Sequence, residues 1–388
     1  MSKGSDDIRP VFNGTSCGLT DALWCPNFWL PNAKSLLRSV TFNSKFVDLD
    51  FGEMFHNFPL HPSLIPFSGV DLTPFRKDLD SLGLTSHLKG SKLLATWTRT
   101  WMGLKTIPEH CVRYYYFLEE LIRGNQRETN NPMRFDKIIL NIFGNEDYNP
   151  TLSNVIKWDE KFNRVAGDIK AYVDDLRAIG VSTDHAWKIA RWASSRIQFV
   201  GTQDAARKRR LDHGPWAGTI FITDDNGIYK SVEQSKWDKS RAYLHECKRI
   251  LESNNGLFDY KRLEIIRGFL CHLAMTFDII FPYLKGFHLT LSSHLAGRNE
   301  DGWKLEDDEW NSYILNRLDQ NQISSDEAND MLKKDSSTKT PQQVKAVPLF
   351  HKCLDSLLRF FSSETPPLVT DRSLTLYLVL NGFVDASK

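Results

Sequence analysis

Two adjacent aspartates, Asp174 and Asp175, lie between two short apolar stretches and have the chemistry to hold a divalent cation. The flanking residues, 171–173 and 176–179, have the composition of short strands, so the acid pair is predicted to lie at the turn of a β-hairpin. Two carboxylates that are close together repel each other, and a bound divalent cation relieves that repulsion. The alternative interpretation is an ordinary polar turn whose two acids face water.

A second pair of acids lies in the stretch from Phe46 to Phe51. Asp48 and Asp50 alternate there with apolar residues, which predicts a strand with both acids on one face. Taken alone, this stretch is equally consistent with a half-buried strand that carries two surface acids. The two acidic stretches must therefore be judged together.

The two stretches resemble motifs of retroelement reverse transcriptases. Residues 172–175, Tyr-Val-Asp-Asp, are similar to the catalytic hairpin of that family. The earlier stretch, aligned on the Pro-Leu-His-Pro sequence at 59–62, is similar to the family's first acidic motif and places its invariant aspartate on Asp50. Asp48 then falls outside the motif and is expected to face solvent. In character the chain is similar to Ty3-like and tyrosine-recombinase (DIRS-like) retroelement enzymes.

A third motif match lies between the two acidic stretches, where Gly103 and Pro108 keep the family's spacing. Glycine lets the backbone approach a nucleotide closely, and proline favours the first turn of a helix. Apolar residues from Cys111 to Ile122 follow at three- and four-residue spacing, which predicts that helix. On its own, this spacing is also typical of a loop that enters a core helix.

The resemblance implies RNA-directed DNA polymerisation, a nucleotidyl transfer that extends a DNA primer on an RNA template with dNTPs. Asp50, Asp174 and Asp175 would hold two Mg²⁺ ions, with Mn²⁺ as the alternative ion, to activate the primer 3′-hydroxyl. Phe55 would stack under the sugar and exclude a 2′-hydroxyl. Lys208 would act as the general acid toward the leaving pyrophosphate, although a basic surface turn is the competing interpretation of that segment.

The resemblance also implies further contacts to substrate and primer, and it shows two departures from the family pattern. Asn13 stands where an aspartate is usual, and Thr15 stands where a second arginine is usual. The implied substrate contacts are Arg9, Phe55, Gly103, Pro108 and Tyr172, and the implied primer grip is Trp216 with Gly218.

Other function classes compete with the polymerase. The departures at Asn13 and Thr15 favour a catalytically inactive or co-opted relic that binds nucleic acid or a protein partner. A cellular enzyme unrelated to polymerases would require three ordered motif matches to be accidental. An RNA-templated RNA polymerase conflicts with the steric role of Phe55.

The expected fold class is α+β, with a polymerase palm that has an antiparallel sheet and packed helices. Residues 1–230 are predicted to form partial fingers and palm, with a polar insertion at 123–165. Residues 231–297 are predicted to form a helical, thumb-like region in which basic and aromatic residues mix, as suits a duplex backbone. Residues 298–347 are predicted to be a polar linker. Residues 348–388 are predicted to form a connection helix and the first strand of a truncated RNase H-like domain, with Asp385 as its aspartate. The chain is expected to be truncated at both ends.

The composition is ordinary for a globular protein, with 388 residues, 41% hydrophobic residues, 25% charged residues and a net charge of +1. Nucleic-acid contacts must therefore come from local basic patches. The six cysteines form no Cys-x-x-Cys pair, which argues against a disulfide framework or zinc site. The polar N-terminus predicts an intracellular rather than a secreted protein. Polar residues interrupt the apolar run at 268–284, so no membrane partner is expected.

Overall fold

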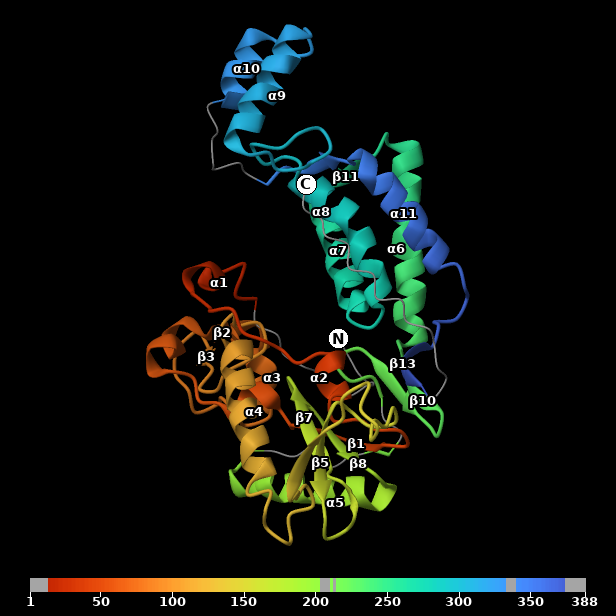
Figure 1. The fold of residues 1–388 in the computed structure, drawn as a ribbon. Coiled ribbons are helices and arrows are strands. Elements are labelled where there is room, and N and C mark those ends of the chain that lie inside the picture. The colour runs from red at the N-terminus through yellow and green to blue at the C-terminus, as the bar shows by residue number, and fades with distance from the viewer. Residues whose placement is uncertain (1–12, 203–209, 212–213, 333–339, 374–388) are drawn as a thin grey trace. The chain divides into compact units, whose positions relative to one another are not determined.

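The computed structural model describes residues 13–202, 210–211, 214–332 and 340–373 of the chain. The chain divides into two compact units (Figure 1). Unit 1 consists of the residues up to Gly214 together with Thr223–Asp225, and unit 2 consists of Pro215–Ile222 and the residues from Asn226 onward. Both units combine helices with small antiparallel sheets, so the prediction of an α+β fold is confirmed. The assignments to palm, fingers and thumb stay predictions.

The central sheet of unit 1 has three antiparallel strands in the order β1-β8-β7, namely β1 (Lys45–Asp50), β7 (Asp168–Tyr172) and β8 (Asp175–Gly180). Because side chains alternate along a strand, the sheet has one apolar and one polar face. The apolar face packs on helices α4 (Ile107–Arg123) and α5 (Thr183–Phe199), which lie beside the sheet in Figure 1. The side chains of this face in the core are Val47, Leu49, Ile169, Ala171, Leu176 and Ala178.

The two helices form where local signals favour them. Pro108 is the second residue of α4, where its missing N–H costs no hydrogen bond. Ser182 caps α5, since its side chain accepts a hydrogen bond from the His185 backbone N–H. The helix α5 lies very close to the sheet, because a Cβ added at Gly180 would be 2.4 Å from the backbone N of Ala186. A larger residue at position 180 would therefore push the helix off the sheet.

Shorter elements complete unit 1. Residues 137–165, within the predicted polar insertion, form a sheet of their own in the order β4-β5-β6, and every residue of its edge strand β4 is exposed. The remaining elements are α1 (Leu19–Ala22), α2 (Ala33–Leu37), η1 (Met54–Asn57), η2 (Pro62–Phe67), β2 (Gly69–Asp71), η3 (Thr73–Phe75), α3 (Arg76–Ser81), β3 (Leu94–Thr96), β4 (Lys137–Leu140), β5 (Val155–Asp159) and β6 (Arg164–Val165).

Unit 2 is built mainly from helices around one apolar cluster. Trp237, Phe277, Phe287 and Phe350 are all fully buried there and come from α6, the connection between α7 and η5, α8 and α11. Its elements are β9 (Ile220–Thr223), which ends at the boundary with unit 1, β10 (Gly227–Ser231), α6 (Gln234–Ser253), β11 (Leu257–Asp259), α7 (Tyr260–Ala274), η5 (Asp278–Leu284), α8 (Lys285–Ser292), β12 (Gln343–Lys345), α11 (Pro348–Phe360) and β13 (Val369–Ser373). No helix in the described part of the chain is long and apolar enough to cross a membrane.

The range predicted to be a polar linker, 298–347, contains folded elements. Helices α9 (Asp307–Asp319) and α10 (Ser325–Leu332) lie inside it, and β12 pairs with β11. Trp310, Ile314 and Ala328 form a small buried cluster between the two helices. The linker prediction is therefore wrong for 307–332, because apolar residues scattered among many polar and charged ones gave too weak a periodic signal.

Candidate active site

Asp50 and Asp175 lie directly opposite each other on β1 and β8. Residues paired in this way point to the same face, with Cβ atoms about 4.5–5.5 Å apart. Asp174 lies in the turn between β7 and β8, and its carbonyl oxygen accepts a hydrogen bond of 2.9 Å from the Phe51 N–H. The hairpin predicted around the acid pair is present, and one end of the sheet carries the three predicted residues, Asp50, Asp174 and Asp175.

The turn that carries Asp174 is tight. Val173, which precedes it, has a φ of +56°, in the left-handed region that a β-branched residue rarely adopts. Tyr172 lies opposite Asp175 across the hairpin. Burial and the Asp175 carboxylate both raise the pKa of Tyr172, so its phenol stays neutral at physiological pH. The row across the sheet end therefore runs Asp50, Asp175, Tyr172.

Two residues of α4 near Asp174, Cys111 and Tyr115, are neutral. Tyr115 stacks on Phe51 with ring centroids 3.9 Å apart. Burial, and secondarily the Asp174 carboxylate, raise the pKa of Cys111 to about 12. Burial is also the main cause that raises the pKa of Tyr115, with smaller contributions from Cys111 and Asp174. The negative charge of Asp174 thus adds to the cost of ionising its buried neighbours.

The next row of the polar face holds an ion pair. Asp48 lies opposite Arg177, whose Nε and Nη2 donate to the two carboxylate oxygens of Asp48 at 2.7 and 2.9 Å. The Gly214 N–H donates to the same carboxylate at 3.1 Å. The Arg177 side chain is fully buried and that of Asp48 is 17% exposed. The prediction that Asp48 faces solvent is wrong, because its strand partner is a buried cation.

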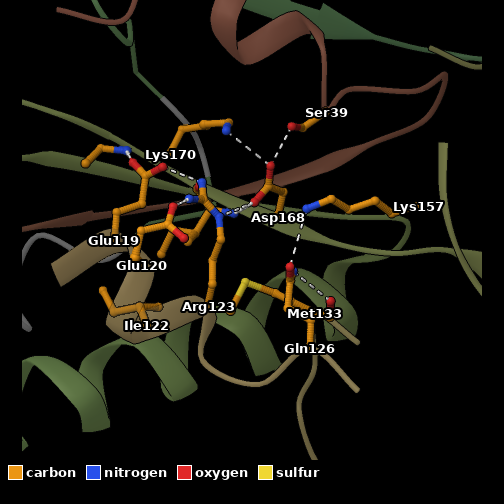
Figure 2. A network of polar contacts seen from close by, with 12 residues as sticks. Ser39, Glu119, Glu120, Ile122, Arg123, Gln126, Met133, Lys157, Asp168 and Lys170 are labelled. Carbon is orange, nitrogen blue, oxygen red and sulfur yellow. Dashed lines mark hydrogen bonds and ion pairs between the residues drawn. The ribbon is translucent and has the colours of Figure 1, made fainter. Parts of the chain in front are cut away.

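A buried polar network closes the outer edge of the sheet (Figure 2). The edge strand is β7, and its outward backbone groups bond to side chains of α4. The Ala171 N–H donates to Glu119 at 2.6 Å, and Arg123 Nη2 donates to the Ile169 carbonyl oxygen at 2.7 Å. Arg123 also forms an ion pair with Glu119. These side chains satisfy backbone groups of β7 that a further strand would otherwise pair with.

Asp168 joins this network at the start of β7 (Figure 2). Its carboxylate accepts hydrogen bonds from Arg123 Nε at 3.1 Å and from the Ser39 hydroxyl at 2.6 Å, and Lys170 lies 3.4 Å away. Burial alone would raise its pKa, but Arg123, Lys170 and Ser39 lower the pKa of Asp168 to about 2. Although burial opposes its charge, the carboxylates of Asp168 and Glu119 raise the pKa of Arg123.

Sequence reasoning missed this network. The spacing of Glu119 and Arg123 on one helix face predicts at most a local ion pair. Their contacts to Asp168 and to the β7 backbone join residues that are 45, 46 and 52 positions apart in the sequence. No local pattern carries that information.

Of the other residues implied by the resemblance in unit 1, Phe55 and Gly103 lie in the described part of the chain. Phe55 is half-buried in η1, packs against the core cluster, and its carbonyl oxygen accepts a hydrogen bond from the Thr100 hydroxyl. Gly103 is exposed, with a φ of +107° that favours glycine. Arg9 and Lys208 lie outside the described residues, as does Asp385.

The implied primer grip lies in unit 2. Trp216 and Thr219 exchange two backbone hydrogen bonds of 2.9 Å around a two-residue turn, in which Ala217 and Gly218 both have positive φ. Trp216 is only 1% exposed, so its ring belongs to the core, and Ala217 and Thr219 of the same turn are also buried. The roles of Trp216 and Gly218 stay predictions.

The three carboxylates suit a metal ion of one particular kind. Within the described residues, no group of three His, Cys, Asp or Glu side chains is arranged to hold a metal ion by itself. Magnesium, however, is usually bound through one or two carboxylates, waters and substrate phosphates. The opposed pair Asp50 and Asp175, with Asp174 beside it, fits an ion whose coordination is completed by substrate. It does not fit a permanent structural ion.

Comparison with known proteins does not identify a family for this chain. No protein-family model and no curated protein sequence matches the chain. Among solved structures, the chain is similar to a foamy viral protease-reverse transcriptase in complex with double-stranded DNA, with 12% sequence identity and a TM-score of 0.43. The similarity covers 93% of this chain and 42% of that chain, so this chain spans less than half of its length. A likeness at this level does not assign a function.

Proposed function

We propose that the chain is an RNA-directed DNA polymerase of the reverse transcriptase kind, which extends a primer with dNTPs. The observation that carries the proposal is the placement of Asp50 directly opposite Asp175, with Asp174 in the connecting turn. The motif around Gly103 and Pro108 supports it, since it leads into the helix that packs on the same sheet. Membership of a Ty3-like or DIRS-like retroelement is part of this proposal.

In this proposal the three aspartates hold two Mg²⁺ ions together with the substrate phosphates. Bound there, the ions would lower the pKa of the primer 3′-hydroxyl and neutralise charge on the leaving pyrophosphate. Phe55 would lie under the sugar, held in place by the bond between its carbonyl and Thr100. Its ring would exclude the 2′-hydroxyl that distinguishes ribose from deoxyribose.

The frame around these carboxylates supports a role that requires fixed geometry. Strands position functional groups more accurately than loops do. The Asp48–Arg177 pair joins β1 to β8 next to the acids. On the other side, Glu119 and Arg123 bond to the backbone of β7. Two networks therefore flank the sheet end and restrict its movement.

A second candidate function is an inactive relative that binds nucleic acid or a protein partner. Two observations favour it, namely the lack of a metal-holding group of three side chains among the described residues and the presence of Asn13 and Thr15 at positions where the family has charged residues. Such a protein would keep the fold and lose the nucleotidyl transfer.

The test is primer extension on an RNA template with Mg²⁺ and dNTPs, in which the chain is compared with its Asp174→Asn variant. The matched control is Asp184→Asn, which removes an exposed carboxylate paired with Lys188; a surface pair contributes about 1 kcal/mol or less. We expect Asp174→Asn to lower the extension rate about 10³-fold or more, since it removes metal stabilisation of several kcal/mol.

Each result has a distinct meaning. Loss in Asp174→Asn with retention in Asp184→Asn supports the polymerase and the role of the hairpin. Equal extension by both variants and the unchanged chain contradicts the assignment of Asp174. No extension by any of them, with an RNA–DNA duplex still bound, supports the inactive relative.

A further inference from the structure

A pocket of about 550 Å³ in unit 2 is lined by basic side chains. Helices α7 and α8 and the segment that follows α8 form its walls. None of the lining residues, all of which lie in the described part of the chain, is an aspartate or glutamate. The basic side chains that line it are Arg267, Lys285, His288, His294 and Arg298.

The helices are oriented so that these side chains meet. Gly286 and Phe287 form the buried side of α8, and a Cβ added at Gly286 would be 2.8 Å from the Phe350 Cα on α11. This close packing turns the opposite side of α8 outward. Lys285 and His288, three residues apart, share that outward side, where both are exposed.

Two of the cations, Lys285 and Arg298, contact uncharged groups that hold the side chain in place without neutralising its charge. Lys285 Nζ lies 4.6 Å above the Trp303 ring. Arg298 Nη1 donates to the Gly302 carbonyl oxygen at 2.7 Å. Both contacts hold the side chain at the pocket while its positive charge remains. The pocket is therefore a preorganised site of positive charge.

Two residues that line the pocket each carry a buried nitrogen atom without a hydrogen-bond partner among the described residues. Arg267 Nη1 contacts His288 Nδ1 at 3.1 Å. Arg267 Nε and His294 Nδ1 are buried and have no hydrogen-bond partner among the described residues. Burial, followed by the charges of Arg267 and Lys285, lowers the pKa of His288. Buried polar groups are normally paired, and a guanidinium N–H can only donate, so Arg267 has an N–H available for an acceptor group.

We infer that this pocket binds a phosphate group. A guanidinium beside further cations matches the charge and the several acceptor oxygens of phosphate better than those of a single carboxylate. The group would come either from a nucleic-acid backbone or from free phosphate or pyrophosphate. For a backbone phosphate the inference deepens the proposed polymerase and rests on it, since residues 231–297 are the region predicted to lie along a duplex; for the free anion it is independent. Neither case uses the carboxylates of unit 1.

The test measures binding by the full chain without Mg²⁺ or dNTPs, so an inactive polymerase would give the same result. The probes are a labelled single-stranded oligonucleotide, followed by fluorescence anisotropy at several salt concentrations, and pyrophosphate, followed by calorimetry. The variants are Arg267→Gln and Lys285→Gln. The control is Lys188→Gln on α5 in unit 1, where the lysine is exposed and lies 2.7 Å from Asp184.

We expect each pocket variant to weaken binding about tenfold or more, as the loss of a charge-assisted hydrogen bond does, and the control to bind normally. A weaker oligonucleotide complex with a salt slope lower by about 0.7 identifies a backbone phosphate. A loss confined to pyrophosphate identifies the free anion. Unchanged binding of both probes by Lys285→Gln, an exposed substitution that leaves the core intact, overturns the inference, even if Arg267→Gln fails to fold.

Discussion

Asp50 lies directly opposite Asp175 on the neighbouring antiparallel strand, where two carboxylates repel each other. One row further along the same face, Asp48 lies opposite Arg177 and the charges attract. The Asp50–Asp175 pair lies at the end of the sheet, and the Asp48–Arg177 pair lies further inside it. An arrangement in which a sheet retains like charges at its accessible end is typical of a functional site, since stability alone would not select it.

The first prediction concerns Asp48→Asn, which leaves the buried Arg177 without its carboxylate. We expect the free energy of unfolding to fall by about 3–5 kcal/mol, because an uncompensated buried charge is costly. Urea denaturation followed by circular dichroism measures the change. The double variant Asp48→Val/Arg177→Met is the control and should recover most of the loss. Equal instability of the single and double variants would show that the ion pair is not the cause.

The second prediction concerns the choice of sugar. Phe55→Ala should increase the incorporation of ribonucleotides relative to deoxyribonucleotides by about tenfold or more, because a steric contact of this kind discriminates by about 1–3 kcal/mol. Primer extension with each nucleotide type gives the ratio. Phe75→Ala, which removes a ring that is 58% exposed, is the control. An unchanged ratio in Phe55→Ala would contradict the proposal that the Phe55 ring excludes the 2′-hydroxyl.

The third prediction concerns pH. The pKa of Asp168 is about 2 in the folded chain and about 3.9 in an unfolded one. Because the folded pKa is the lower one, its ionisation stabilises the fold above the unfolded pKa, and this contribution is lost as the pH falls toward 2.

Asp168→Asn removes that pH-dependent contribution. The difference in unfolding free energy between the unchanged chain and Asp168→Asn should therefore shrink by about 1 kcal/mol between about pH 6 and about pH 3. Urea denaturation at both pH values measures it. A difference that stays constant with pH would contradict the assignment of the low pKa to Asp168.

The fourth prediction compares two glycines of unit 2. Gly218 has a φ of +83°, and an added Cβ would be 2.4 Å from His272 Nε2. We expect Gly218→Ala to lower the free energy of unfolding by about 1–2 kcal/mol, mainly through the left-handed backbone. Gly268 lies in α7, and an added Cβ there meets nothing within 4 Å. Gly268→Ala should therefore raise the free energy of unfolding by about 0.5–1 kcal/mol. Thermal denaturation of both variants checks the opposite signs.

Much of the framework around the site could be predicted from local patterns. The alternation from 46 to 51 predicted β1, and the apolar flanks of Asp174 and Asp175 predicted the hairpin. The three-four spacing after Pro108 predicted α4. Each of these signals involves neighbouring residues in the sequence, and each matches the period of its element.

What could not be predicted depends on residues far apart in the chain. The partner of Asp48 is 129 residues away, and the contacts of Arg123 reach across 45 residues to Asp168. From the sequence alone a charged residue is predicted to lie at the surface, because charged residues are rarely buried unless they are paired. The helices at 307–319 and 325–332 were missed for a related reason, since their few apolar residues are buried against each other and not against a main core.

The order of charges on β1 and β8 also has a consequence for how the chain folds. A slip of one residue between the two strands would turn every side chain of one strand to the wrong face. Arg177 would then enter the apolar core, and Asp175 would no longer meet Asp50. Misaligned pairings of β1 with β8 are thus penalised, and the charge sequence specifies the strand alignment in the absence of any ligand.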